Sequence, residues 1–553
     1  MSVADLIDEH ASNSPFKKAL YFPQSDSEQP SYTHLTYQQL KKRADKVADG
    51  LRKRGVKKGT KVLLFVRPSL EFPVIAYALF KIGAVAILID PGMGRKNLFK
   101  CIEEVEPKVL IAVPEVFLGK KIFPKVFRSI ECFVILDQSN SFKTGLAKLL
   151  NPNALNFVEI EETGKPLNYT EKMGADDLAA IVFTSGGTGR PKGVEYTHAI
   201  YEHQVDLLKK TYSLTTDDID LPAFPLFALF TLAMGMTVVI PDMDPTKPAK
   251  ACPEKLVSHI KNHGVTFAGG SPAIWEKVGH FCKDKRTKLL SLKSLMMFGA
   301  PVSAHIHEDF EQVLPNGSTY TPYGATECLP VATISGKELL ANKLAEKSKQ
   351  GHGTCVGKPA DKTEVKIIAP VEGIIPTMSD AKIQSEGEIG EIIVRGPQAT
   401  SRYYKLADKT ALAKISDGES FWHRMGDLGY KDAQGRLWFC GRMVHSFEFA
   451  NERLYSVPTE SHFNNHPDVK RSALINFGSS SSAKPGLVIE PKYKKLSESL
   501  KQDLIEISKK AGYDKKIGAF FVHDSFPVDI RHNIKIDRAK LASEARQGNL
   551  MEL

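Results

Sequence analysis

The chain has 553 residues, 42% of them hydrophobic, and 74 Lys+Arg against 64 Asp+Glu give a formal net charge of +10. A single hydrophobic core does not extend over this length, so we expect one large and one small domain. The basic excess is mild and forms no concentrated block, which permits the binding of anions but gives no reason to expect a nucleic-acid partner.

The cysteines and the first residues indicate the compartment. Seven cysteines are dispersed without CxxC pairs or metal-ligand spacing, which is typical of a reducing environment. The start of the chain carries acidic residues and lacks a basic segment followed by an apolar run, so it does not resemble a secretory signal. We therefore expect a cytoplasmic protein.

Helical and strand-like patterns alternate in the first part of the chain. Apolar residues at helical spacing predict a helix over residues 37–54, which ends before Gly55. Short apolar runs predict strands at residues 61–66, 85–89, 109–113, 133–136 and 179–183. This alternation indicates α/β layers with buried, largely parallel strands.

An uncharged segment over residues 221–241 is long enough to span a bilayer. Pro222, Pro225 and Gly235 are poor residues for a continuous helix. We therefore expect two buried pieces joined by a turn, the first of them lining an apolar pocket, and no transmembrane span. Peripheral contact with a membrane stays open.

The pattern changes from about residue 360, where short strands at 364–368 and 390–394 indicate a β-rich subdomain. Beyond Arg442 a compact α+β pattern begins. We expect an α/β fold with a large N-terminal domain over residues 1–441, which joins α/β layers to the β-rich subdomain. A hinge over 442–446 and a small α+β C-terminal lid domain over 447–553 follow. A homodimer or a complex with other enzymes of a pathway is compatible with the sequence.

The strongest local signal is a loop that follows the strand predicted at 179–183. Glycines let backbone N–H groups converge on phosphate oxygens, hydroxyls add donors and a lysine adds positive charge. The pattern GxxxxGK[ST] does not fit here, so this is not a Walker A loop. We expect the loop to bind the phosphates of ATP through Thr184, Ser185, Gly186, Gly187, Thr188, Gly189 and Lys192.

This loop resembles that of the adenylate-forming superfamily, which includes acyl-CoA synthetases, peptide-synthetase adenylation domains and luciferases. Further matches follow in the family's order and spacing: LTY at 35–37, GAP at 299–301, YGATE at 323–327, GDLG at 426–429, GRLWFCGR at 435–442 and KIDR at 535–538. The resemblance implies an enzyme that uses ATP and Mg²⁺ to convert a small-molecule carboxylic acid into an acyl-adenylate.

The resemblance also implies roles for single residues. Glu327 is a hard oxygen ligand suited to Mg²⁺, and it is expected to act in catalysis together with Thr188 and Lys192. Asp427 would accept the ribose hydroxyls, and Arg442 would donate to the same sugar or to phosphate. The other residues expected to contact the nucleotide are Gly299, Ala300, Pro301, Tyr323, Gly324 and Thr326.

Lys535 is expected to neutralise charge on the α-phosphate as pyrophosphate leaves. Its context departs from the family, because residues 527–535 are one residue longer than the expected flexible segment and lack its glycine. Arg531 is a second candidate for this role, and a purely structural Lys535 stays an alternative.

The acid is expected to be medium to long and apolar. The uncharged segment supplies aromatic and sulfur-bearing side chains without a charge to pair a polar substrate tail. The residues expected to contact the acyl group are Phe224, Phe227, Phe230, Met234, His198 and Ala325. His198 and His423 are candidate bases, although a structural histidine is the more common interpretation of each.

Four segments resemble more closely the β-lactone synthetases of bacterial olefin biosynthesis, namely residues 222–230, 234–245, 421–427 and 527–533. In that family a β-hydroxy acid is adenylated and its own hydroxyl then expels AMP, so the resemblance implies the same two steps. Ala228, Met425 and Val444 depart from thioester-forming relatives, which puts CoA use in doubt. A medium- or long-chain acyl-CoA synthetase stays the alternative, and a binding protein without turnover is disfavoured by the retained polar residues.

Overall fold

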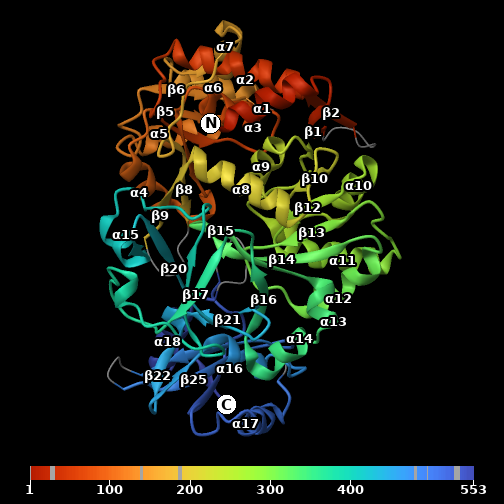
Figure 1. Cartoon of the computed structure of the whole chain (residues 1–553), viewed down its shortest axis with the longest axis vertical. Coiled ribbons are helices and arrows are strands. Elements are labelled where there is room, and N and C mark those ends of the chain that lie inside the picture. Colours follow the sequence, from red (N-terminus) through yellow and green to blue (C-terminus); the bar gives the residue numbers. More distant parts are fainter. Residues whose placement is uncertain are drawn as a thin grey trace.

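Two α/β layers and a β-rich part form the larger, N-terminal part of the chain, and a small α+β part follows at the opposite end (Figure 1). This arrangement confirms the predicted fold class. The computed structural model describes residues 2–24, 31–137, 141–167, 169–184, 190–478, 482–494, 496–528 and 536–553.

The first layer is a seven-stranded sheet whose pairs are parallel except for the last. Its apolar strands are buried on both faces, as parallel strands between helices must be. In spatial order the strands are β7 (Leu155–Asn156), β6 (Cys132–Ile135), β5 (Val109–Ala112), β3 (Lys61–Phe65), β4 (Val85–Ile89), β8 (Leu178–Thr184) and β9 (Lys192–Thr197). The predicted strands are therefore confirmed, with ends that differ by a residue at most positions.

The second layer is the first half of a fourteen-stranded sheet. Its inner pairs, from β1 to β14, are parallel. In spatial order its strands are β2 (Ser31–Thr36), β1 (Lys18–Gln24), β11 (Thr237–Val239), β10 (Ile219–Pro222), β12 (Phe267–Gly270), β13 (Ser294–Met297) and β14 (Ser318–Ala325).

The β-rich part continues this same sheet with antiparallel pairs. Strand β14 turns directly into β15, so the second α/β layer and the β-rich part share one backbone hydrogen-bond network. Its strands in spatial order are β15 (Cys328–Ser335), β16 (Thr354–Pro359), β21 (Leu437–Arg442), β20 (Ser420–Lys431), β18 (Gly390–Arg395) and β17 (Glu364–Ile368), and β19 (Lys414–Asp417) pairs with β20.

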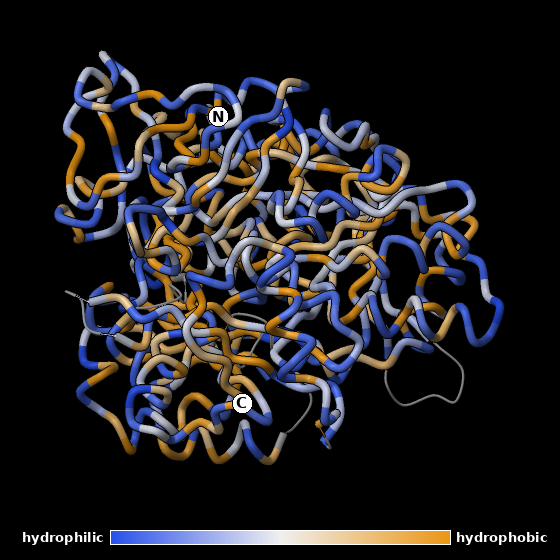
Figure 2. The backbone as a smooth tube through the Cα atoms, turned by 90° about the horizontal axis from the view of Figure 1, so that it is seen from below, coloured by the Kyte–Doolittle hydropathy of each residue, from blue (hydrophilic) through white to orange (hydrophobic). Residues whose placement is uncertain are grey.

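Helices fill the space between the two layers and cover their outer faces, and hydrophobic stretches concentrate toward the interior (Figure 2). The central core packs α1 (Val3–Asn13), α2 (Tyr37–Arg52), α3 (Glu71–Lys81), α8 (His198–Thr211) and α9 (Phe227–Ala233) between the sheets. Helices α4 (Arg95–Val105), α5 (Pro114–Ile122) and α6 (Ser141–Leu150) cover the first sheet, and α10 (Pro253–His263), α11 (Pro272–Asp284) and α12 (Ala304–Val313) cover the second. Smaller helices are α7 (Phe157–Thr163), α13 (Gly336–Ala341), α14 (Leu344–Lys347) and α15 (Ala407–Ala413).

Helix α2 shows how local sequence determines an element. Thr36 caps its N-terminus with a side chain that accepts the Gln39 N–H, and Gln39 reaches back to the Thr36 N–H. Leu40, Val47 and Leu51 recur at helical spacing and are buried in the central core. The predicted helix over 37–54 is confirmed and ends two residues earlier.

The C-terminal part has its own four-stranded sheet and two hydrophobic cores. It contains β22 (Phe447–Phe449), β23 (Glu452–Leu454), α16 (Ser456–Phe463), β24 (Val469–Asn476), β25 (Pro485–Pro491), α17 (Leu500–Lys510), β26 (Ala519–Val522), α18 (Arg538–Arg546) and β27 (Met551–Glu552). Helix α16 approaches β21 closely at Gly441, where φ is 122° and a Cβ would lie 2.3 Å from the Ser456 Oγ. Only glycine fits such a contact with this backbone conformation.

The uncharged segment over 221–241 is broken as predicted. It forms the end of β10, helix α9 and strand β11, and Gly235 takes a positive φ of 83° in the turn before β11. Across the described ranges, no helix has both the length and the apolar character to cross a membrane.

Candidate active site

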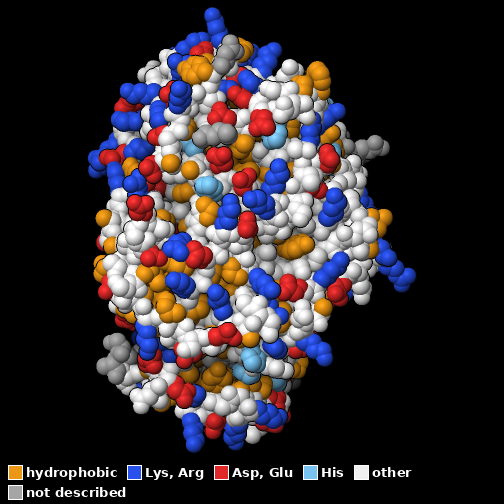
Figure 3. Space-filling model, in the orientation of Figure 1, with side chains coloured by type: hydrophobic (Ala, Val, Ile, Leu, Met, Phe, Trp, Pro, Cys, Tyr) orange, Lys and Arg blue, Asp and Glu red, His pale blue; other side chains and the backbone are white. Residues whose placement is uncertain are grey.

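A cavity of about 3670 Å³ opens between the two α/β layers, the β-rich part and the C-terminal part. One end is apolar and lies between the layers, whereas the other is polar and is lined by strand ends of the β-rich part and by α16. On the face shown in Figure 3 acidic and basic side chains are interspersed. The features that distinguish this site are therefore inside the cavity.

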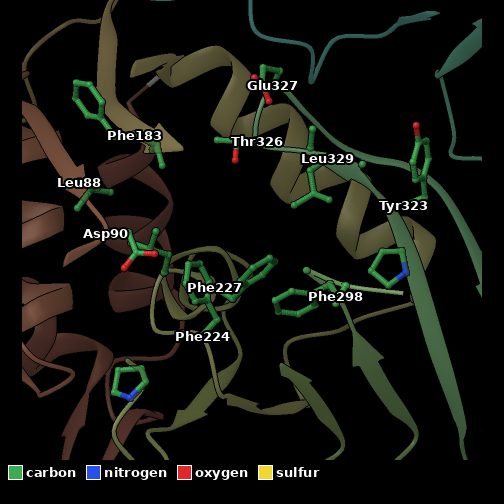
Figure 4. Close-up of a pocket in the computed structure, with 18 of the residues that line it drawn as sticks. Leu88, Asp90, Phe183, Phe224, Phe227, Phe298, Tyr323, Thr326, Glu327 and Leu329 are labelled. Carbon is green, nitrogen blue, oxygen red and sulfur yellow. The ribbon is translucent and has the colours of Figure 1, made fainter. Parts of the chain in front are cut away.

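The apolar end is built from aromatic rings on the segment 224–230 and from Phe298, which directly follows strand β13. The ring centroids of Phe227 and Phe298 are 4.6 Å apart, and those of Phe224 and Phe227 are 5.8 Å apart. Figure 4 shows these rings grouped in the pocket, with Leu88 and Phe183 contributed by the first sheet. Such a wall suits a hydrocarbon chain.

A buried polar pair holds this aromatic segment in place. Asp220 on β10 accepts a hydrogen bond of 2.7 Å from the Thr231 hydroxyl on α9, and Asp220 is 1% exposed. Burial raises the pKa of Asp220 to about 7, partly opposed by the hydrogen bond from Thr231. The carboxyl group is therefore a structural element of the acyl wall whose protonation is sensitive to pH.

The polar end contains a buried carboxylate with two donors. The Tyr323 hydroxyl donates to Asp427 Oδ2 at 2.7 Å, and Arg442 Nε lies 3.0 Å from Asp427 Oδ1. Asp427 is 4% exposed, whereas the Arg442 side chain is about half exposed toward the cavity. Asp427 raises the pKa of Arg442, so the guanidinium keeps its charge. The antiparallel pairing of β20 with β21 places these two residues opposite each other.

Glu327 lies at the point where the polar and apolar ends meet. Its Oε1 accepts a hydrogen bond of 2.7 Å from the Tyr403 hydroxyl, and its backbone carbonyl accepts the Thr400 N–H at 2.8 Å. The Lys192 ammonium stands 4.6 Å from the centroid of the Tyr403 ring. Glu327 and Lys192 are thus brought together around one tyrosine, and Figure 4 shows Glu327 and Thr326 above the aromatic rings.

Glu327, held by Tyr403, suits a magnesium ion that is bound together with a nucleotide. The described ranges hold no group of three or more His, Cys, Asp or Glu side chains that could bind a metal ion. Mg²⁺ typically takes one or two carboxylates and completes its octahedron with substrate phosphates and water. Glu327, which is oriented by Tyr403, supplies one such carboxylate at the cavity wall.

Comparison with known proteins identifies the family. Residues 7–404 match the profile of the AMP-binding enzyme family. An olefin beta-lactone synthetase from Xanthomonas campestris pv. campestris is 39% identical over 524 residues, which cover 93% of this chain and 91% of that protein. A long-chain-fatty-acid–CoA ligase from Thermus thermophilus is 25% identical over 444 residues, with 80% and 77% covered.

The chain belongs to the AMP-binding enzyme family. It is accordingly an AMP-forming adenylating ligase. An o-succinylbenzoate coenzyme A synthetase from Bacillus subtilis, solved with ATP and a magnesium ion, has the same fold, with a TM-score of 0.74 and 21% identity over 97% of this chain and 99% of that one.

Most of the predicted site residues that the structure describes meet at this AMP-binding enzyme's cavity. Those that line it are Lys192, Phe224, Phe227, Phe230, Gly299, Ala300, Pro301, Tyr323, Gly324, Ala325, Thr326, Glu327, Asp427 and Arg442. The side chain of Thr184, the loop residues Ser185, Gly186, Gly187, Thr188 and Gly189, and Lys535 with Arg531 lie outside the described residues.

His198 and Met234 do not line the cavity, so the structure does not bring these two predicted acyl contacts together with the others. His198 is fully buried, its Nδ1 accepts the Val3 N–H at 3.3 Å, and burial lowers its pKa to about 4. Met234 follows the end of α9 and packs in the central core. Ala228 likewise faces away from the main cavity.

His423 lines the cavity on its polar side. Its Nδ1–H donates to the Ala413 carbonyl at 3.2 Å, and it is 2% exposed. Burial, reinforced by the charges of Lys414 and Lys192, holds the pKa of His423 well below its usual value. The imidazole is therefore neutral and stands beside cations, away from the apolar end.

Several cavity residues carry no recognisable motif. Tyr403 orients Glu327, and Lys414, which does not itself line the cavity, donates to the Thr400 carbonyl. Burial lowers the pKa of Lys414 to about 8, opposed by the Glu327 carboxylate. Phe298, which directly precedes the GAP motif, and Gln204 on α8 also line the cavity. The position of Phe298 beside a motif is the one signal in the sequence that would have found any of them.

Proposed function

We propose that this ligase adenylates an apolar β-hydroxy acid, releases pyrophosphate, and then forms a β-lactone with loss of AMP. The observation that carries the proposal is the 39% identity, over nine-tenths of both chains, with a protein named olefin beta-lactone synthetase. The cavity supports it independently, because an apolar wall of aromatic rings adjoins a polar end with a carboxylate, a lysine and an arginine.

In the proposed complex ATP occupies the polar end. Its phosphates lie on the loop 184–192 and near Lys192, and its ribose hydroxyls are accepted by Asp427, which Tyr323 and Arg442 hold in place. Glu327 binds Mg²⁺, which offsets the repulsion between the substrate carboxylate and the phosphates. The Tyr403 hydroxyl fixes the Glu327 rotamer, so the carboxylate is oriented before the nucleotide arrives.

The acyl chain occupies the apolar end, against Phe224, Phe227 and Phe298. The acid carboxylate then reaches the α-phosphate beside Thr326 and Glu327. After adenylation the β-hydroxyl oxygen attacks the acyl carbon, the bond from that carbon to the phosphate oxygen breaks, and AMP leaves with the electron pair. The step requires one molecule in one rotamer, so enclosure of the chain replaces a second substrate.

We further propose that residues 442–446 form a hinge and that residues 447–553 act as a lid that carries Lys535. The short helix Met443–His445 follows β21, and Val444 is 70% exposed there. Ion pairing of Arg442 with Asp427 fixes the large domain's side of this hinge. A lid that moves about it would bring Lys535 to the α-phosphate for adenylation and withdraw it for the second step.

The test supplies ATP, Mg²⁺ and a long-chain β-hydroxy acid, with and without CoA, and identifies the products by NMR. The proposal requires AMP release and a β-lactone without CoA, and only acyl-AMP or its hydrolysis products from the matching acid that lacks the hydroxyl. If AMP accumulates only when CoA is present and the product is a thioester, the chain is an acyl-CoA ligase, as its relative in Thermus thermophilus is named.

A further inference from the structure

A buried amide stands in the apolar wall of the cavity. Gln204 lines the cavity and is 2% exposed; its amide N–H group faces the Tyr196 hydroxyl oxygen, whereas its Oε1 has no hydrogen-bond partner among the residues that the structure describes. Buried side-chain amides are nearly always paired, since an unpaired one loses its hydration without compensation. This amide oxygen therefore needs a partner that enters with the substrate.

The surroundings of Gln204 are those of the acyl chain. It lies on α8, one turn after Tyr201 and one turn before Leu208, and both neighbours also line the cavity. The Tyr201 ring stacks on Phe230, with centroids 4.4 Å apart and an interplanar angle of 7°. An acceptor and two donors are thus set in a wall that is otherwise aromatic and aliphatic.

Gln204 also lies close to the reacting end of the substrate. Its side chain adjoins Tyr196, and the Tyr196 hydroxyl donates to the backbone carbonyl of Thr326, the residue before Glu327. The Tyr196 hydroxyl proton is therefore already engaged in a hydrogen bond to the Thr326 carbonyl. A substrate hydroxyl near the acyl carbonyl would be within the region between this tyrosine and the aromatic wall.

We propose that Gln204 is the hydrogen-bond partner of the substrate's own hydroxyl and holds it in the rotamer from which it attacks the acyl carbonyl. The inference rests on the proposed lactone-forming function. In the bound acid the substrate hydroxyl donates a hydrogen bond to the amide Oε1. When the carbon–oxygen bond of the lactone forms, the hydroxyl proton passes to the departing phosphate or to water, because a neutral amide does not take it up.

The same contact makes Gln204 a specificity-determining residue. An acid without the hydroxyl leaves the buried amide oxygen unpaired, so it is bound less well than the β-hydroxy acid although it is more apolar. Rejection by an unpaired polar group is the kind of discrimination that a purely hydrophobic pocket does not provide.

The experiment compares Gln204→Met, which keeps the length of the side chain and removes its polar atoms, with the control Leu208→Met on the same wall. Acid-dependent pyrophosphate release is measured with a long-chain β-hydroxy acid and with the matching acid that lacks the hydroxyl. Lactone formed per adenylate is measured by NMR, and melting temperatures of all variants are recorded.

We expect Gln204→Met to lower kcat/KM for the hydroxy acid by about 10- to 100-fold. The kcat/KM for the acid that lacks the hydroxyl should be unchanged or higher, and less lactone should form per adenylate. The melting temperature of Gln204→Met should be unchanged or higher, since a buried amide with an unpaired oxygen is replaced by an apolar group. Leu208→Met should keep the wild-type preference for the hydroxyl.

Three results would overturn the inference. Equal losses with both acids and a lower melting temperature would make Gln204 a structural residue. An unchanged preference for the hydroxy acid in a Gln204→Met enzyme that still forms lactone would refute this assignment alone. A wild-type enzyme that gives no lactone from any β-hydroxy acid would refute the proposed function and the inference with it.

Discussion

Replacement of Glu327 by glutamine tests the magnesium site most directly. The substitution removes one negative charge but keeps the shape, and the amide oxygen still accepts the Tyr403 hydroxyl that now lies 2.7 Å from Oε1. A change in metal dependence would therefore report the charge rather than a collapsed side chain. Removal of a group that only orients a metal ligand costs roughly 10- to 100-fold in affinity, so loss of the ligand's charge should cost at least about 100-fold in Mg²⁺.

Tyr403→Phe is a milder change at the same site, and its Mg²⁺ requirement is compared with that of Glu327→Gln. It removes one hydrogen bond to an ionised group, worth about 1.5–3 kcal/mol, while the carboxylate stays. We expect a smaller shift of the Mg²⁺ requirement, of about 10-fold. Glu195→Gln is a matched control, because Glu195 is also buried near the site, pairs with Arg402 and does not line the cavity.

The assay is acid-dependent pyrophosphate release at saturating ATP and acid over a range of free Mg²⁺. The expected order of half-maximal Mg²⁺ concentrations is wild type and Glu195→Gln lowest, then Tyr403→Phe, then Glu327→Gln. An unchanged Mg²⁺ titration for Glu327→Gln, or a larger shift for Tyr403→Phe than for Glu327→Gln, would show that Glu327 does not bind the metal.

Three further predictions concern the lid, the nucleotide and the acyl wall. Lys535→Ala should slow acyl-AMP formation severely while ATP binding largely survives, and equal losses in both, measured by pyrophosphate release and equilibrium binding, would contradict its role. Tyr323→Phe removes one donor to Asp427 and should raise the KM for ATP by about 10-fold with little change in kcat; an unchanged KM would exclude this carboxylate from ribose binding. The folded-state pKa of Asp220, about 7, exceeds its ordinary value of 3.8, so its contribution to stability is present below pH 3.8 and is lost as the pH rises through 7. Asp220→Asn should therefore gain about 2–3 kcal/mol over wild type between pH 5 and pH 8 in urea unfolding, and a constant difference would mean that Asp220 does not titrate there.

Predictions from the sequence were most accurate for features that depend on residues close together in the chain. Strand β4 has the predicted bounds, because five apolar residues follow a glycine turn and end at Asp90. Asp427 and Arg442 were predicted by motifs and meet because β20 and β21 pair in register.

The sequence predicted less well where tertiary packing decides which face of an element is used. Phe227 and Phe230 face the cavity, whereas Met234, in the same uncharged segment, lies past the end of α9 and turns into the core. His198 follows the predicted phosphate loop in sequence, yet it is covered by the N-terminal helix α1 at Val3. A contact between residues 195 positions apart leaves no local signal in either of them.

The division between these two groups of residues has a consequence for the reaction. The groups proposed for adenylation are charged and lie on β9, β20 and β21 and in the turn between β14 and β15, whereas the acyl wall is made by α8, the segment 224–230 and Phe298. Because the two sets come from different elements, the wall can change without disturbing the charges. Lactone and thioester formation share the acyl-adenylate and differ only in the nucleophile, so the product can be altered at the wall alone. For this chain Gln204 is the residue at which such a change should separate the two steps, since its Oε1 has no partner among the described residues and it belongs to none of the charged groups.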